Sequence, residues 1–175
     1  LFGILAGVDV VGDHRHRQPV AQRAGQRGGQ RGLARAHRAA ELKIRAAKAR
    51  LRRDKQEALD ALQTLCTIEP DQPAHFMGLA TLLAQWGEFE EAAEVLDELA
   101  AWDNLTATYA ARIEEQRGDT ALMGGELEAA QTHYEAALEY GMIEVTRRTI
   151  QIKLEAARDP KLAPLVAAYF DPFEP

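Results

Sequence analysis

The sequence predicts an all-α protein built from paired helices, and three observations support this. Ala, Leu and Glu, which all favour helix, dominate the second two-thirds of the 175 residues. Val and Ile are sparse and never alternate over a long run, so a sheet has little support. Apolar residues instead recur at helical spacing, in segments separated by short breaks. Helices joined by short loops usually pack antiparallel to their neighbours.

The first two predicted helices span residues 40–53 and 57–68. In the second of them, Leu59, Leu62 and Leu65 recur at helical spacing and form one apolar face. Two prolines shortly after residue 68 end this helix, because proline cannot continue a helix and restricts the residue before it.

The remaining predicted helices are separated by glycines or by Asp-Asn and Asp-Pro pairs, which are ordinary stop signals. They span residues 75–86, 89–102, 105–117, 126–140, 142–158 and 161–170. Gly118 is expected to end the helix at 105–117, so that the residues just after it are irregular. Residues 161–170 are expected to form a short last helix or a packed tail.

The first 38 residues differ in composition from the rest. Residues 13–38 are rich in Arg, Gln, Gly and Ala, and their four glycines are expected to interrupt any helix. Such a segment buries too little apolar surface to offset the entropy of ordering it. The predicted organisation is therefore a basic, low-complexity, disordered arm at 1–38, a helical-repeat domain at 39–158, and a capping helix or tail at 159–175.

Charge is divided unevenly along the chain. Residues 1–55 carry 14 Lys and Arg against 4 Asp and Glu, a net charge of +10. Residues 56–175 carry 7 against 23, a net charge of −16. A basic arm followed by an acidic body suggests two different environments or partners.

Equivalent residues return after 34 and then after 38 positions. In the second helix of each pair, a shift of 34 preserves three identities: Ala58/Ala92, Leu62/Leu96 and Leu65/Leu99. A further shift of 38 places Gly125, Leu127, Ala130, Tyr134 and Ala137 at the equivalent positions of the third unit. A fixed period of this length indicates a repeat architecture.

A helix–turn–helix period of 34 residues resembles the tetratricopeptide repeat. The resemblance is best over residues 73–104, at Leu79, Ala80, Leu83, Gly87, Phe89, Ala92, Leu96, Leu99 and Ala100. Ala80 and Ala92 are small enough for two helices to approach closely, and Gly87 permits a tight turn between them. The resemblance covers about residues 39–140. It implies three degenerate units and a capping helix at 143–157, stacked into a right-handed α-solenoid.

The resemblance implies a non-catalytic protein-binding module, an adaptor or scaffold that holds a peptide or partner helix in a concave groove. In the family, the first helix of each unit lines that groove. The exposed positions expected there are Lys43, Ala47 and Arg50 in the first unit, Met77, Thr81 and Gln85 in the second, and Glu114, Glu115 and Arg117 in the third. Ala47 and Gly78 stand where one chaperone-binding subset has Asn, so that clamp is not expected.

Two other roles remain open. The basic arm could neutralise phosphates and make the chain a nucleic-acid-associated protein, through arginines that include Arg15, Arg17, Arg23, Arg27 and Arg31. The arm has no interleaved aromatic residues for base stacking, which weakens this reading. The chain could also be a non-catalytic piece of a larger assembly.

No group of residues indicates catalysis, and an enzyme is not expected. Cys66 lies on an amphipathic segment and is expected to be a buried structural thiol. His14 and His16 form an HxH pair beside Asp13, but no second cluster of ligands follows, so neither a dedicated metal site nor a cofactor is expected.

The sequence favours a cytoplasmic protein without a membrane partner. A lone cysteine cannot form an internal disulfide. The apolar residues 1–11 amount to about half of the ~20 that span a bilayer. They also lack the preceding positive charges of a signal peptide.

Overall fold

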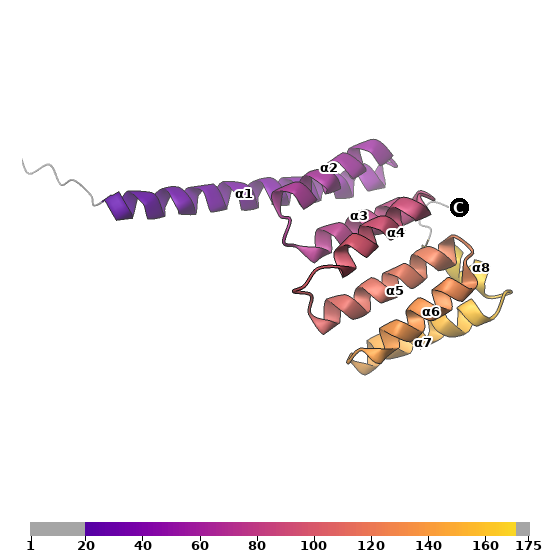
Figure 1. Ribbon diagram of the computed structural model, residues 1–175. Coiled ribbons are helices and arrows are strands. Elements are labelled where there is room, and N and C mark those ends of the chain that lie inside the picture. The colour runs from indigo at the N-terminus through magenta and orange to yellow at the C-terminus, as the bar shows by residue number, and fades with distance from the viewer. Residues whose placement is uncertain (1–19, 171–175) are drawn as a thin grey trace, which may run out of the picture. The chain divides into compact units, whose positions relative to one another are not determined.

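The computed structural model describes residues 20–170, which form helices and connecting turns without any strand (Figure 1). In chain order the helices are α1 (Val20–Leu51), α2 (Lys55–Ile68), α3 (Pro73–Gln85), α4 (Phe89–Ala100), α5 (Ala107–Met123), α6 (Leu127–Glu139), α7 (Glu144–Arg158) and α8 (Ala163–Phe170). The all-α class expected from the sequence is confirmed. Over the same residues, no helix combines the length and apolar composition needed to cross a membrane.

In each of the first three helix pairs, the turn between the two helices contains one residue in the left-handed backbone region. These residues are Arg53, Gly87 and Gly125, with φ of 56°, 78° and 83°. They stand 34 and then 38 positions apart, which are the shifts of the apolar repeat. The repeat seen in the side chains is therefore also a repeat of the backbone.

The three turns also share a hydrogen bond. The amide after the left-handed residue donates to the carbonyl oxygen five positions earlier, from Asp54 to Ala49, from Glu88 to Leu83 and from Glu126 to Ala121. This bond is typical of helices that end in the Schellman motif, where the left-handed residue satisfies carbonyls of the last turn. The same local chemistry thus turns the chain back in every unit.

The predicted packing residues form the core. Fully buried members include Ala58, Leu65, Ala92, Leu96, Leu99, Ala130, Tyr134 and Ala137. Burial of each leucine contributes about 1.5–3 kcal/mol. Helix α2 packs on α3, α4 on α5 and α6 on α7, so each pair contacts the next. The predicted solenoid of stacked helix pairs is confirmed, and α8 completes it by packing on α5 and α7.

Before residue 39 the structure differs from the sequence-based expectation. The chain is helical from Val20 onward, so the helix expected at 40–53 is only the second half of α1. Ala, Arg and Gln favour helix strongly enough to carry it through four glycines, each costing about 1 kcal/mol. Residues 1–19 lie outside the described residues. The chain divides into two compact units, Leu1–Ala36 and His37–Pro175, and the second contains the repeat.

The expectation that Gly118 ends a helix is wrong. Helix α5 continues through Gly118 to Met123 and has 17 residues, against 13 in α3. The four additional residues of the third unit therefore form about one further helical turn rather than a loop. A Cβ at Gly118 would lie 2.5 Å from Cε1 of Tyr134, so this glycine serves the close packing of α5 against α6.

Candidate partner-binding face

The first helices of successive pairs, α1, α3, α5 and α7, are joined by polar bridges. Arg50 Nη2 in α1 donates to Gln85 Oε1 in α3 at 2.9 Å. Gln116 Nε2 in α5 donates to Thr81 Oγ1 at 2.6 Å and to the Met77 carbonyl oxygen at 2.7 Å. We call the surface that these four helices present the first-helix face.

The bridge between α5 and α7 is charged. Lys153 Nζ donates to Glu115 Oε1 at 2.7 Å and to Asp119 Oδ2 at 2.8 Å. The Tyr134 hydroxyl of α6 donates to the other Asp119 oxygen at 2.8 Å. Burial raises the pKa of Asp119, and Lys153 opposes that rise. Burial and the neighbouring Asp119 carboxylate likewise raise the pKa of Tyr134, so its hydroxyl remains a donor.

This charged bridge was missed by the sequence reasoning, although a signal for it existed. Lys153 occurs on the buried side of α7, between Ile150 and Leu154. A lysine among buried apolar residues needs a carboxylate partner, because an unpaired buried charge is costly. The bridges between first helices join residues 34 to 39 positions apart, which is about one repeat.

Most of the predicted binding residues of the first two units are accessible. Exposed or half-buried are Lys43, Ala47, Arg50, Thr81 and Gln85. The expectation that Met77 is exposed is wrong, because Met77 is only 7% exposed and belongs to a core cluster with Ile113. Met77 contributes its carbonyl oxygen, rather than its side chain, to the bridge with α5.

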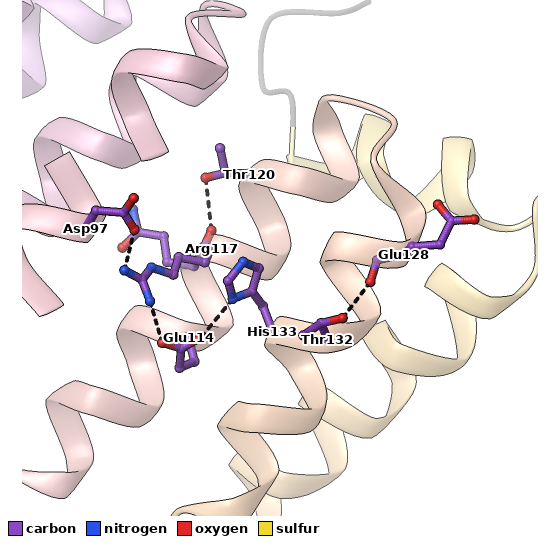
Figure 2. Close-up of polar contacts among 8 residues, drawn as sticks. Asp97, Glu114, Arg117, Thr120, Glu128, Thr132 and His133 are labelled. Carbon is purple, nitrogen blue, oxygen red and sulfur yellow. Dashed lines mark hydrogen bonds and ion pairs between the residues drawn. The ribbon is translucent and has the colours of Figure 1, made fainter. Parts of the chain in front are cut away.

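The three positions predicted in the third unit separate onto different sides of α5. Glu115 faces α7, as described above, but Glu114 and Arg117 face the second helices α4 and α6 (Figure 2). Arg117 pairs with Asp97 of α4 and with Glu114, and His133 Nδ1 lies 2.8 Å from Glu114 Oε2. The hydrogen bond from His133, followed by Arg117, lowers the pKa of Glu114. This cluster stabilises the contact between pairs and is not part of the first-helix face.

Two hollows open beside the bridges. The large hollow, of about 740 Å³, lies between the C-terminal ends of α3 and α5 and helix α8, and its lining includes Gln85, Trp86, Phe89, Met123, Leu127, Pro164 and Ala168. The small hollow, of about 600 Å³, lies between α5 and residues 141–150, and its lining includes Thr108, Arg112, Met142, Ile143 and Ile150. Both could accept bulky apolar side chains.

The family comparison matches this geometry. A model of the tetratricopeptide repeat-like domain matches residues 22–159, which is most of the chain. The chain belongs to the tetratricopeptide repeat-like family. Tetratricopeptide repeat-like domains mediate protein interactions, and the fold is typically non-catalytic. No curated protein and no solved structure matches the chain.

In this tetratricopeptide repeat-like domain, charge is sorted between the two layers of helices. Counted from His37, the first helices α1, α3, α5 and α7 contain 11 Lys and Arg against 6 Asp and Glu. The second helices α2, α4 and α6 contain 1 against 10. The first helices therefore carry a net charge of +5 and the second helices −9, within a chain of net charge −6.

The structure describes only some of the residues considered for nucleic-acid or metal binding. Arg23, Arg27 and Arg31 lie at intervals of four in α1, whereas Arg15, Arg17 and the His14–His16 pair lie outside the described residues. Over residues 20–170, no three His, Cys, Asp or Glu side chains gather in a way that could hold a metal ion.

Cys66 is half-buried rather than fully buried, and burial raises its pKa to about 11. A thiol of that pKa is largely protonated at neutral pH and is a poor nucleophile. The thiol is therefore better suited to packing within α2 than to chemistry.

Proposed function

We propose that this chain is a non-catalytic adaptor whose first-helix face binds a peptide or helix of another protein. The main support is that successive first helices are bridged at intervals of one repeat, so that α1, α3, α5 and α7 present one continuous surface. Accessible side chains lie on that surface, the small hollow opens beside α5 and α7, and the large hollow opens at its edge, where α3 and α5 end beside α8. Repeat solenoids offer such extended surfaces to partners.

The bridges also explain why the surface would bind with little reorganisation. Thr81 and Gln116 are held by each other, and Gln85 is held by Arg50. Side chains already ordered in the free protein lose less entropy when a partner arrives, and each loss avoided saves about 0.5–1.5 kcal/mol. A preorganised surface favours recognition of a defined segment.

Site-specific photo-crosslinking tests the proposal. A benzophenone amino acid placed at Ala47 or Thr108, both exposed on first helices, should cross-link a discrete partner in extracts of the source cells. The same group at Glu94 or Glu128, exposed on second helices, is the matched control. Charge reversal at Lys43 and Arg50 should reduce the cross-link. Cross-links from the second-helix positions alone would refute the assignment of the face.

A second role is suggested by the spacing of arginines in α1. Arg23, Arg27 and Arg31 follow one another at intervals of four, which keeps successive positions of a helix within about 40° of each other. A row of cations at this spacing suits phosphates. Changing the three residues to Gln should then weaken duplex DNA binding and reduce its salt dependence. Unchanged DNA binding would contradict this second role, and the adaptor role would be the one that remains.

A further inference from the structure

We infer that the partner segment of the first-helix face is acidic and amphipathic, with bulky apolar side chains for the two hollows and carboxylates for Arg50 and Arg112. This inference rests on the proposed function and adds the chemistry of the partner. Three observations carry it: the lining of the large hollow, the position of the two arginines, and the charge of the two helix layers.

The large hollow calls for apolar side chains. Its lining contains no Asp, Glu, Lys, Arg or His, and it combines Trp86, Phe89 and Met123 with small residues of α8. A volume of about 740 Å³ is enough for several side chains. Burial of one Leu or Phe side chain there is worth about 1.5–3 kcal/mol before the costs of association.

Each hollow has an arginine beside it. Arg112 is exposed and lines the small hollow. Arg50 is exposed and holds Gln85, which lines the large hollow. Among the described residues, no carboxylate forms an ion pair with either arginine; Glu115, the acidic residue of the small hollow, is paired with Lys153. The guanidinium groups can therefore pair with carboxylates of a partner, in bidentate geometry.

The charge of the two helix layers favours the same partner. An acidic segment is attracted to first helices of net charge +5 and repelled by second helices of net charge −9. A basic segment would instead be drawn to α4 and α6, away from both arginines. Charge thus favours the first-helix face for an acidic partner and disfavours a basic peptide there.

Three fluorescein-labelled peptides test the inference by fluorescence anisotropy with the full chain. The first repeats Leu-Glu-Glu-Leu-Leu-Glu, the second replaces every Glu with Lys, and the third replaces every Leu with Ala. The first peptide should bind with an affinity that falls as salt rises, because its carboxylates meet exposed arginines. The second and third should each bind at least about tenfold more weakly.

Two variants and one control variant locate the binding. Arg112→Gln should weaken binding of the first peptide about fivefold. Arg148→Gln removes the same charge from an exposed position of α7 outside both hollows and should weaken binding by less than about twofold. Ala168→Trp, at an exposed position that lines the large hollow, should weaken binding about tenfold by filling the space. Far-UV circular dichroism should show the same helix content in all three proteins.

Some results would overturn the inference. Equal affinity for the Glu and Lys peptides, no binding of the Glu peptide, or equal losses from Arg112→Gln and Arg148→Gln would each do so. The proposed function fails separately, on the cross-linking experiment. Cross-links from Ala47 and Thr108 without selective binding of the Glu peptide would leave the face correct and its partner chemistry wrong.

Discussion

At the scale of single residues, one turn position is occupied by glycine in two pairs and by arginine in the first. Arg53 adopts a φ of 56°, where a side chain costs about 1–2 kcal/mol. Arg53→Gly removes that cost. It also increases the conformational entropy of the unfolded chain, which lowers the free energy of unfolding by about 0.4–1 kcal/mol. We expect a net gain of about 0.5 kcal/mol in the free energy of unfolding, measured with urea.

The converse change provides the comparison. Gly87→Ala should lower the free energy of unfolding by about 1 kcal/mol, because its φ is 78° although no atom lies within 4 Å of the new Cβ. Gly141→Ala is the control, since its surroundings are equally open and its φ is not positive. Equal effects at Gly87 and Gly141 would show that the turn tolerates side chains.

Gly118 makes a different prediction, because its constraint is a neighbour rather than φ. The Cβ of Gly118→Ala would lie 2.5 Å from the buried Tyr134 ring, and we expect a loss of about 1–3 kcal/mol. Gly78→Ala in α3, where the Cβ meets only Leu62 at 3.8 Å, should instead be neutral or stabilising. A double variant with Tyr134→Leu should recover part of the loss, and strict additivity would contradict the steric explanation.

Glu114 contributes to the way in which the stability of the fold decreases at acid pH. Its pKa is lowered from 4.5, mainly by the hydrogen bond from His133. The folded state therefore binds the proton more weakly than the unfolded chain, so the stabilisation is present above about pH 4.5 and is lost as pH falls through the lowered pKa.

Glu114→Gln should lower stability at neutral pH and flatten the decrease that begins as pH falls below about 4.5, as followed by thermal unfolding. Glu94→Gln, at an exposed position of α4, is the control and should keep the wild-type profile. A Glu114→Gln profile parallel to that of the wild type would contradict the role given to the contact with His133.

At the scale of helices, Lys153 connects α7 to two carboxylates of α5. Lys153→Met would leave Asp119 and Glu115 without their cation, and we expect unfolding free energy to fall by about 3 kcal/mol. Lys55→Met removes the more exposed pair with Glu88 and should cost less than about 1 kcal/mol. Adding Asp119→Asn to Lys153→Met should recover part of the loss, and no recovery would argue against the buried pair.

The helices also show which parts of the fold the sequence could predict. Ala92, Leu96 and Leu99 were predicted to pack because they fall at the packing positions of the repeat that the sequence resembles, and they are fully buried. Gly118 was misread because its reason for being glycine is Tyr134, on another helix and 16 positions away. A local stop signal and a packing requirement look the same in one sequence.

The candidate face was predicted in part for the same reason. Arg50, Thr81 and Gln85 were placed on it by the resemblance to the family, and their hydrogen bonds join neighbouring first helices. Met77 lies one turn before Thr81 on the same side of α3, but its side chain belongs to a core cluster with Ile113 of α5, a contact with another unit that the period does not reveal. Neither hollow could be predicted, since each is framed by segments far apart in the sequence.

At the scale of the whole repeat domain, stability should be distributed from neighbour to neighbour. Helix α8 packs on α5 and α7, and Ala163 belongs to a core cluster with Leu122 and Ile150. Removing residues 161–175 should speed amide hydrogen exchange in α5 and α7 but leave α2 unchanged, because units of a solenoid contact only adjacent units. Uniform acceleration across all helices would indicate a single shared core instead.

The extra turn of α5 restricts how the length of this chain can vary. One inserted residue in the middle of α5 would rotate everything after it by about 100°. Gln116 and Asp119 could then not both reach α3 and α7. Four residues rotate it by only about 40°, which side chains can absorb. First helices of this kind should therefore lengthen or shorten by whole turns, so that insertions of three or four residues are tolerated where insertions of one or two are not.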